Sequence, residues 1–300
     1  MAVLYGSRMP DNRLIRLNDS AAVRVGNIWV RAADLPEALS RFTRLVFCLT
    51  GSEDHPYSLR GSATSLKWRN QRLTFLCNHQ IAGFQPDHVV FPLDRDGKAL
   101  ASGSTFMQMK PADGYNSEEF ADVCAMLFRP EDYQYPNIDR AFFEVLEADM
   151  WHGDGESTFI IYGYPTSLRK LECAEPTYAL SHIKVLQTVI AARYLRPSQA
   201  LGVHALEMQR TRSHSSDGLS GGAVFQLGQD ARGFFCGFAG LVIRGSDNSE
   251  VLHFMDGKLL MQFMKRIAVE ESPASRPAAL RVSSSSLGRN AALPVASHPP

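Results

Sequence analysis

Short apolar segments separated by glycine, proline and polar turns run through most of the 300-residue chain, and they constrain its fold more than any other feature. Asp122–Phe128 and Thr158–Gly163 are short for helices and are bounded by proline or glycine, which favours buried strands. Gly61–Trp68 and Arg72–His79 flank a short polar break and predict a β-hairpin. This succession of strands argues against alternating βαβ units and predicts an all-β protein.

Later segments continue the pattern, with strands expected at His182–Leu195, Leu201–Met208, Ala223–Leu227, Phe234–Ile243 and Val251–Phe254. Two segments are typical of helices. Leu35–Phe42 follows Asp34, a residue type that caps helix N-termini, and carries proline in its first turn. Lys258–Val269 places its large apolar side chains on one helical face. Two β-barrels or a β-sandwich, followed by one helix, fit this layout.

The composition is that of a globular protein, with 45% apolar and 21% charged residues. The 31 basic and 31 acidic residues balance, which gives no general attraction to nucleic acid or to an anionic membrane. We expect an N-terminal extension at residues 1–40, a first barrel at 41–150 and a second barrel at 151–270. Residues 271–300 are rich in Ser, Pro and Ala, a composition that predicts a disordered tail.

Cysteine usage and the N-terminus predict a cytoplasmic protein. The five cysteines are an odd number without a CxxC pair, which argues against a disulfide framework or a zinc ribbon. Cys77 and Cys124 lie in apolar runs and are expected to be small buried side chains rather than metal ligands. No HExxH motif occurs, and we expect neither a metal nor a cofactor. The N-terminus lacks the apolar core of a signal peptide, and no apolar stretch reaches the length of a bilayer span.

The strongest local motif surrounds Ser220, which lies between glycines and leads into an expected strand. Gly218 can adopt backbone angles that are closed to other residues, so its N–H and that of Ser220 can converge on one carbonyl oxygen. Two such donors stabilise the oxyanion of acyl transfer, and loss of one raises the barrier by about 3–4 kcal/mol. We interpret Ser220 as a nucleophile beside an oxyanion hole. The motif by itself also fits a glycine-rich turn without chemistry.

A serine nucleophile needs a base and an acid that orients the base. His79 ends the expected early hairpin, and Asp122 opens a buried strand. Taken alone, each of them could equally be a structural residue without a catalytic role. The three residues run in the order His, Asp, Ser, with separations of 43 and 98 residues. Serine proteases of one class have the same order, with separations of about 45 and about 93 residues. The joint match favours a catalytic triad.

On these residues the chain resembles the trypsin-like serine peptidases of the chymotrypsin fold, and among them the bacterial intracellular members rather than the disulfide-rich secreted ones. The resemblance runs from about Arg41 to Val269 and includes Gly61–Leu66, Phe75–His79, Asp122–Leu127, Tyr162–Pro165, Gly218–Gly222, Gly240–Gly245 and Lys258–Val269. It implies two six-stranded antiparallel barrels with the active site between them. It also implies hydrolysis of peptide bonds in protein substrates through an acyl-enzyme.

The resemblance assigns roles to individual residues. His79 would be the general base, Asp122 its orienting partner and Ser220 the nucleophile. The segment from Ile243 through Arg244 to Gly245 would pair with the substrate backbone as an added strand.

The chain departs from the family near its substrate pocket. His214 occupies the pocket floor, which argues against a trypsin-like preference for Lys or Arg. With Ser215, Arg212 and Arg244 nearby, an acidic or polar residue before the scissile bond is favoured, unless the arginines are solvated loop charges.

Further departures concern activation and the residues around the histidine. Leu219 replaces the aspartate that binds a freed N-terminus in the trypsin branch, so activation by that route is not expected. The segment from Leu76 through Cys77 to Asn78 stands where the family usually has small residues. Gln80 replaces the cysteine that follows the histidine in secreted members.

Two other readings remain open. The residues around Ser220 also satisfy the G-x-S-x-G elbow of α/β-hydrolase esterases, with Asp247 and His253 following in the required order. A catalytically inactive binding protein on a peptidase fold is the other alternative. An active cytoplasmic peptidase requires control, and we hypothesise a regulatory protein partner that contacts residues 1–40 or the Ser-rich tail.

Overall fold

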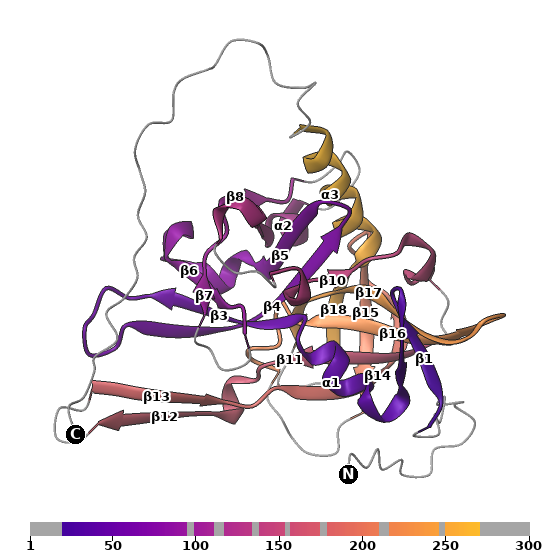
Figure 1. The fold of residues 1–300 in the computed structure, drawn as a ribbon, viewed down its shortest axis with the longest axis horizontal. Coiled ribbons are helices and arrows are strands. Elements are labelled where there is room, and N and C mark those ends of the chain that lie inside the picture. Colours follow the sequence, from indigo (N-terminus) through magenta and orange to yellow (C-terminus); the bar gives the residue numbers. More distant parts are fainter. Residues whose placement is uncertain are drawn as a thin grey trace.

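The computed structural model describes residues 20–94, 99–110, 117–133, 138–153, 157–174, 179–209, 216–245 and 250–270. Strands dominate, and they form two curved sheets that lie side by side, one from each half of the chain (Figure 1). The expected all-β fold with a C-terminal helix is therefore confirmed. The expected tail at 271–300 lies outside the described residues.

The first sheet has the strand order β7-β6-β3-β4-β5-β9-β8, with β10 beside β4. Its strands are β3 (Thr43–Leu49), β4 (Tyr57–Trp68), β5 (Gln71–Cys77), β6 (Val89–Pro92), β7 (Leu100–Ala101), β8 (Thr105–Gln108), β9 (Val123–Leu127) and β10 (Phe143–Glu144). Within the described part of the chain, the outer strands β7 and β8 do not pair with each other. This half is thus an open barrel rather than the closed six-stranded one expected; β7, with two residues, offers few backbone groups for closure.

The second sheet closes on itself. Its ring follows the order β16-β11-β14-β15-β18-β17, and β17 pairs again with β16. The strands are β11 (Thr158–Gly163), β14 (Thr188–Pro197), β15 (Val203–Met208), β16 (Ala223–Asp230), β17 (Gly233–Gly245) and β18 (Val251–Asp256). All neighbours in this ring are antiparallel, as expected for the second barrel. A separate hairpin consists of β12 (Arg169–Ala174) and β13 (Ala179–Val185).

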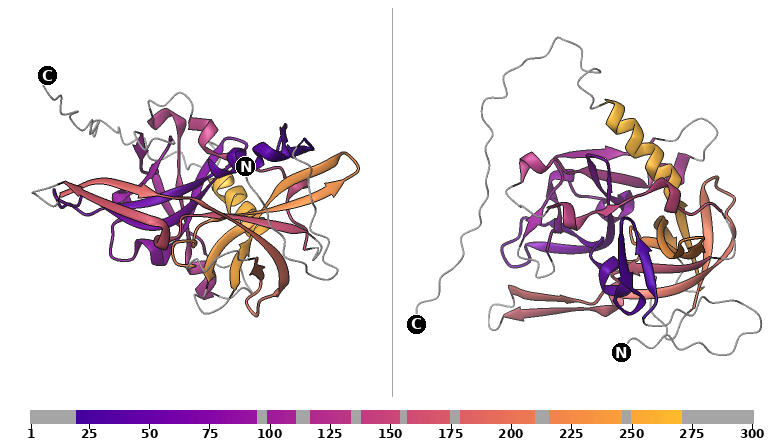
Figure 2. Two further views of the ribbon diagram at one scale, coloured as in Figure 1. Left: turned by 90° about the horizontal axis from the view of Figure 1, so that it is seen from below. Right: turned by 45° about the vertical axis from the view of Figure 1, so that its right-hand side comes forward.

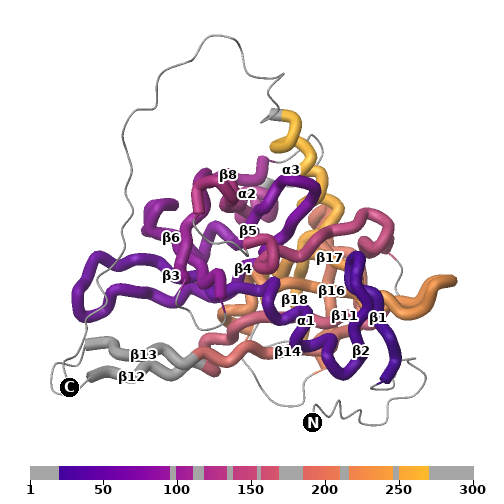
Figure 3. Tube along the Cα trace, in the orientation of Figure 1, coloured from indigo at the N-terminus to yellow at the C-terminus, as the bar shows by residue number. Residues whose placement is uncertain are grey.

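The N-terminal residues add a hairpin to the second barrel. Strand β1 (Ala22–Val25) runs parallel to β17, and β2 (Ile28–Arg31) forms the outer edge. Figures 1 and 3 show this indigo hairpin beside the barrel strands. The buried Arg24 guanidinium contacts the carboxylates of Asp149 and Asp230, which fixes the hairpin to the body. A buried cation needs such partners.

The first helix differs from the expectation. Helix α1 (Leu35–Ser40) ends two residues before Phe42, and the Asp34 side chain does not cap it. The Asp34 carboxylate instead accepts hydrogen bonds from the Arg31 guanidinium, three residues earlier. An aspartate before an apolar helix start was the right residue type, but a neighbouring arginine competes for its oxygens.

Other boundaries shift in similar ways. Strand β5 ends at Cys77, so His79 lies in the 3-10 turn that follows and not at a strand end. The expected strand at His182–Leu195 is interrupted between Val185 and Thr188. Short 3-10 helices connect the strands at η1 (Ala32–Asp34), η2 (Asn78–Ile81), η3 (Pro86–His88), η4 (Pro130–Asp132), η5 (Ile138–Ala141), η6 (Glu147–Asp149) and η7 (Thr166–Leu168).

The main core lies between the two sheets. Phe143 of β10 contacts Phe225 of β16 with ring centroids 5.1 Å apart, and each ring is buried. Helix α3 (Gly257–Glu270) adds Phe263, whose ring packs on Phe75 at 6.2 Å. The gold helix lies along both halves in Figures 1 and 2. Burial of each such side chain stabilises the fold by about 1.5–3 kcal/mol, so the halves are held together by a shared core.

A short helix, α2 (Ser117–Ala121), precedes β9 and leads directly into Asp122. In the described ranges, neither this helix nor either of the others is long and apolar enough to cross a membrane.

Candidate active site

The turn that carries Ser220 begins at Ser216 and leads into strand β16. Gly218 and Gly221 have positive φ values of 87° and 80°, a region that side chains with a Cβ rarely occupy. A Cβ at Gly221 would lie 2.0 Å from the Ser62 carbonyl oxygen. The backbone conformation therefore requires glycine at both positions, and the close approach of strand β4 requires it at Gly221 as well.

The amides of this turn divide into two sets. Three are used internally, with those of Leu219, Gly221 and Gly222 donating to the carbonyls of Ser216, Val242 and Leu219. The amides of Gly218 and Ser220 have no acceptor among the described residues. An amide pair left free on a rigid turn can donate to an oxygen from outside the chain, which is the requirement for an oxyanion hole.

His79 and Asp122 are in direct contact. The imidazole Nδ1 lies 2.9 Å from both carboxylate oxygens of Asp122, and the His79 backbone N–H donates to Oδ1 at 3.0 Å. The pairing of Cys77 with Val123 places the two residues beside each other, because His79 follows Cys77 by two residues and Asp122 directly precedes Val123. An Nδ1–H that donates to a carboxylate leaves Nε2 as the acceptor.

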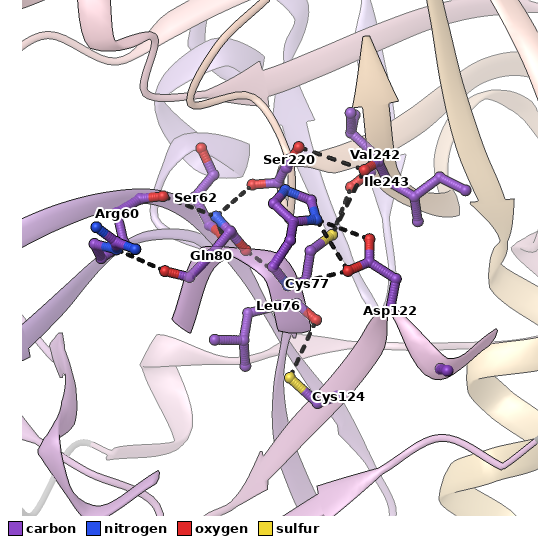
Figure 4. Close-up of polar contacts among 12 residues, drawn as sticks. Arg60, Ser62, Leu76, Cys77, Gln80, Asp122, Cys124, Ser220, Val242 and Ile243 are labelled. Carbon is purple, nitrogen blue, oxygen red and sulfur yellow. Dashed lines mark hydrogen bonds and ion pairs between the residues drawn. The ribbon is translucent and has the colours of Figure 1, made fainter. Parts of the chain in front are cut away.

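The Ser220 hydroxyl points elsewhere. Its Oγ donates to the carbonyl of Ile243 at 3.4 Å, and no hydrogen bond joins it to His79 in the described part of the chain. The Cys77 thiol also contacts the Ile243 carbonyl, at 3.9 Å. Figure 4 shows Ser220 and Cys77 beside this carbonyl. The structure thus brings His79 and Asp122 into direct contact, whereas Ser220 is hydrogen-bonded to Ile243.

Gln80, one residue after the histidine, is a buried polar clamp (Figure 4). Its amide nitrogen donates to the carbonyls of Ser62 at 3.0 Å and Ser220 at 2.9 Å, and makes a longer contact of 3.3 Å to Arg60. Its Oε1 accepts the Cys77 N–H at 2.7 Å. One side chain therefore ties the histidine turn, strand β4 and the serine turn together. The sequence indicated only that a cysteine of secreted proteins is replaced here.

Strand β4 contributes two hydroxyls that sequence reasoning also missed. Ser62 Oγ donates to the Gly218 carbonyl at 2.6 Å and accepts the Tyr164 N–H at 2.9 Å. Thr64 Oγ1 donates to the Gly221 carbonyl at 2.8 Å. Both side chains are fully buried, and small hydroxyls in an apolar strand are the signal that could have indicated them.

The expected substrate-pairing segment lies at the end of β17. Ile243 is buried, whereas Arg244 and Gly245 are exposed. The Arg244 guanidinium lies 3.2 Å from Glu119 Oε1, so its charge is partly matched. A Cβ at Gly245 would meet the Ser216 side chain at 2.7 Å. The expected pocket residues Arg212, His214 and Ser215 lie outside the described residues.

The esterase reading is wrong on structural grounds. A nucleophile elbow leads from a strand into a helix, whereas Ser220 leads into strand β16 of an antiparallel barrel. His253 lies in β18 opposite Arg244, and Asp247 lies outside the described residues. Burial, together with the charge of Arg244, lowers the pKa of His253.

The described residues contain one group of possible metal ligands. One ligand atom each from Cys77, His79 and Asp122 lies within 4.8 Å of the others. Burial raises the pKa of the Cys77 thiol well above its ordinary value, so it is a neutral thiol at physiological pH. The sequence predicted no metal site because the cysteine spacing matches no zinc motif.

The closed and open barrels with the C-terminal helix make the fold chymotrypsin-like. No protein-family model matches the chain, and no curated protein matches it. Among solved structures, 246 chains match. One is an HtrA-type protease, AlgW with tripeptide, at 17% identity and a TM-score of 0.46; the match covers 78% of this chain. It spans 62% of the length of that protease chain.

Proposed function

We propose that the protein is a serine endopeptidase that hydrolyses peptide bonds in protein substrates. The observation that carries the proposal is the contact of His79 with Asp122 beside a turn whose Gly218 and Ser220 amides have no acceptor within the described ranges. A base oriented by a carboxylate and an amide pair for an oxyanion are the two parts of acyl-transfer chemistry. A glycine-rich turn without chemistry does not require this pairing.

In the proposed reaction, Ser220 Oγ turns from the Ile243 carbonyl to His79 Nε2. Hydrogen bonds of this kind are often long in the free enzyme and shorten when substrate binds. Oγ attacks the scissile carbonyl carbon as its proton moves to Nε2, and the electron pair on the carbonyl oxygen is stabilised by the Gly218 and Ser220 amides. The C–N bond then breaks and His79 returns the proton to the amine. Water releases the acyl group by the same sequence of steps.

The substrate would be bound as an extra strand. The exposed end of β17 at Arg244 and Gly245 offers backbone groups for antiparallel pairing. We propose a preference for an acidic or polar residue before the scissile bond, with His214 and Ser215 in the pocket. Arg244 would contribute less than a free arginine, because Glu119 already balances its charge.

A cytoplasmic location and a regulator complete the proposal. Cys48, Cys77, Cys124 and Cys236 are free thiols, which agrees with a reducing compartment and with the bacterial intracellular members of the fold. A protein partner would control access, through residues 1–40 or the tail. No nucleic acid or membrane enters the proposed reaction.

The test is mapping of new protein N-termini in a proteome incubated with the full chain or with its Ser220→Ala variant. The proposal predicts new N-termini with the wild-type chain that are absent with Ser220→Ala. The exposed serine variant Ser52→Ala, remote in sequence, serves as the control and should cut as the wild-type chain does. Identical N-termini with Ser220→Ala would overturn the proposal.

A binding protein without activity is the second candidate. The observation that favours it is the hydrogen bond from Ser220 to Ile243 in place of one to His79. This candidate predicts no new N-termini, and equal retention of extended peptides by the wild-type chain and Ser220→Ala.

A further inference from the structure

The ligand group at the end of β5 combines three side-chain types that bind zinc together in proteins: a thiol, an imidazole and a carboxylate. Cys77 is the last residue of β5, His79 lies in the turn after it, and Asp122 directly precedes β9. The antiparallel pairing of β5 with β9 fixes all three. The group therefore forms without any contribution from Ser220.

The distances suit a small tetrahedral ion. Zinc bonds of about 2.0 Å to nitrogen or oxygen and 2.3 Å to sulfur place neighbouring ligand atoms about 3.5 Å apart. In the structure, Nδ1 of His79 lies 2.9 Å from the Asp122 oxygens, and the three ligand atoms all lie within 4.8 Å. Shifts of about 1 Å, within side-chain rotation, would therefore bring the group to zinc geometry.

We propose that Cys77, His79 and Asp122 form an inhibitory site for Zn²⁺. The ion enters from the solvent side, where the His79 and Asp122 side chains are 51% and 27% exposed. The buried thiol forms the inner ligand. Its Sγ donates to the Val242 and Ile243 carbonyls at 3.5 and 3.9 Å and accepts the Gln80 backbone N–H at the start of the turn. A thiol is a weak donor and a weak acceptor, so the bond to the metal replaces weak hydrogen bonds.

Zinc binding moves one proton from Cys77 to solvent and shifts another within the His79 ring. The Cys77 thiol loses its proton to solvent and forms the Zn–S bond. The proton on His79 Nδ1 moves to Nε2, and Nδ1 forms the Zn–N bond. One Asp122 oxygen gives up its hydrogen bond with His79 and binds the metal instead, and water fills the fourth coordination position. With a proton on Nε2, His79 cannot accept one from Ser220. The inhibition rests on the proposed function, but metal binding does not.

Cys124 provides a matched control for Cys77. Both thiols are buried in neighbouring strands, yet they belong to different core clusters, and Cys124 Sγ contacts the Leu76 carbonyl at 3.6 Å. Cys124 is not part of the ligand group. A thiol near the site but not in it should leave metal binding unchanged.

The test is titration of the full, reduced chain with Co²⁺, a spectroscopic substitute for Zn²⁺. The proposal predicts a thiolate-to-cobalt charge-transfer band that Zn²⁺ displaces. Cys77→Ser should abolish the band and weaken zinc binding at least tenfold, and Cys124→Ser should retain both. Asp122→Asn, which keeps the thiol, should retain a weakened band, and it gives a second test if Cys77→Ser fails to fold.

Three results would overturn the proposal: no band in the wild-type chain, a band that survives Cys77→Ser, or a band that Asp122→Asn leaves unchanged in strength and affinity. The cobalt spectrum needs no turnover, so its outcome is independent of peptidase activity. If the band appears but no peptide is cut, the zinc site stands and the proposed function fails. If peptide is cut without the band, the reverse holds.

Discussion

Gln80→Glu is the change that tests most sharply how the candidate site is held together. The two side chains have the same length, and the carboxylate can still accept the Cys77 N–H that Oε1 accepts at 2.7 Å. It cannot donate to the Ser62 and Ser220 carbonyls, which receive the Gln80 amide at 3.0 and 2.9 Å. The substitution therefore removes the two N–H donors of the buried Gln80 side chain and keeps its acceptor.

The expected cost follows from these contacts. The Ser220 carbonyl keeps a second donor, the Ser62 backbone N–H at 3.3 Å, whereas the Ser62 carbonyl loses the Gln80 amide in a buried place. A buried carbonyl left without a donor costs about 1–3 kcal/mol, which is the loss expected in the free energy of unfolding. Two carbonyl oxygens beside the new carboxylate also disfavour its charge. Its pKa is then raised above the value of about 4.3 in the unfolded chain, so the loss should grow as the pH rises from 5 to 8.

Urea unfolding at pH 5 and pH 8 measures both effects. Gln80→Met, which is similar in size but has no charge, should be destabilised equally at both pH values. Gln85→Glu, at an exposed position, is the control, and surface changes of this kind stay within about 0.5 kcal/mol. If Gln80→Glu behaves like Gln85→Glu, the clamp has no energetic role and the reasoning is refuted.

Three further predictions follow from particular contacts. The Arg72 guanidinium holds the pKa of Asp139 at about 2, below its ordinary 3.8, so their ion pair stabilises the fold above about pH 4 and is lost as the pH falls toward 2. Acid titration of the unfolding free energy should show wild type and Asp139→Asn converging near pH 2, and a constant difference would contradict this. A Cβ at Gly237 would lie 1.6 Å from the Asp149 carbonyl, so Gly237→Ala should cost at least about 3 kcal/mol in urea unfolding, and a cost below 1 kcal/mol would be inconsistent with the contact. Asp122→Asn should reduce kcat on a cleaved peptide by about 10⁴-fold through the wrong imidazole tautomer, with thermal unfolding little changed; full activity would exclude its orienting role.

The strand pattern could be predicted because apolar runs between turn residues persist locally. Thr158–Gly163 matches β11 residue for residue, and Lys258–Val269 lies within α3. The contact of His79 with Asp122 was also predictable, since two weak signals gained weight from their order along the chain. What these elements share is a signal contained in a few neighbouring residues.

The remaining features depend on partners far apart in sequence. Gln80 reaches the Ser220 carbonyl 140 residues away, and no spacing pattern indicates which backbone groups a buried amide will meet. Strand β1 is four residues long and pairs with β17 from the other end of the chain, so nothing local marks it as part of the barrel. The ligand group containing Cys77 was missed because strand register, not spacing, brings Asp122 to it.

The most direct test of the central claim is labelling of the native chain with a fluorophosphonate probe, followed by mass spectrometry of the modified peptide. Such a probe reacts with a serine only when a base activates it and an oxyanion site accepts the phosphoryl oxygen. We predict one adduct, on Ser220, that is lost in Ser220→Ala and greatly slowed in His79→Ala. A native chain that folds and forms no adduct, or one that labels at an unchanged rate in His79→Ala, would contradict the account.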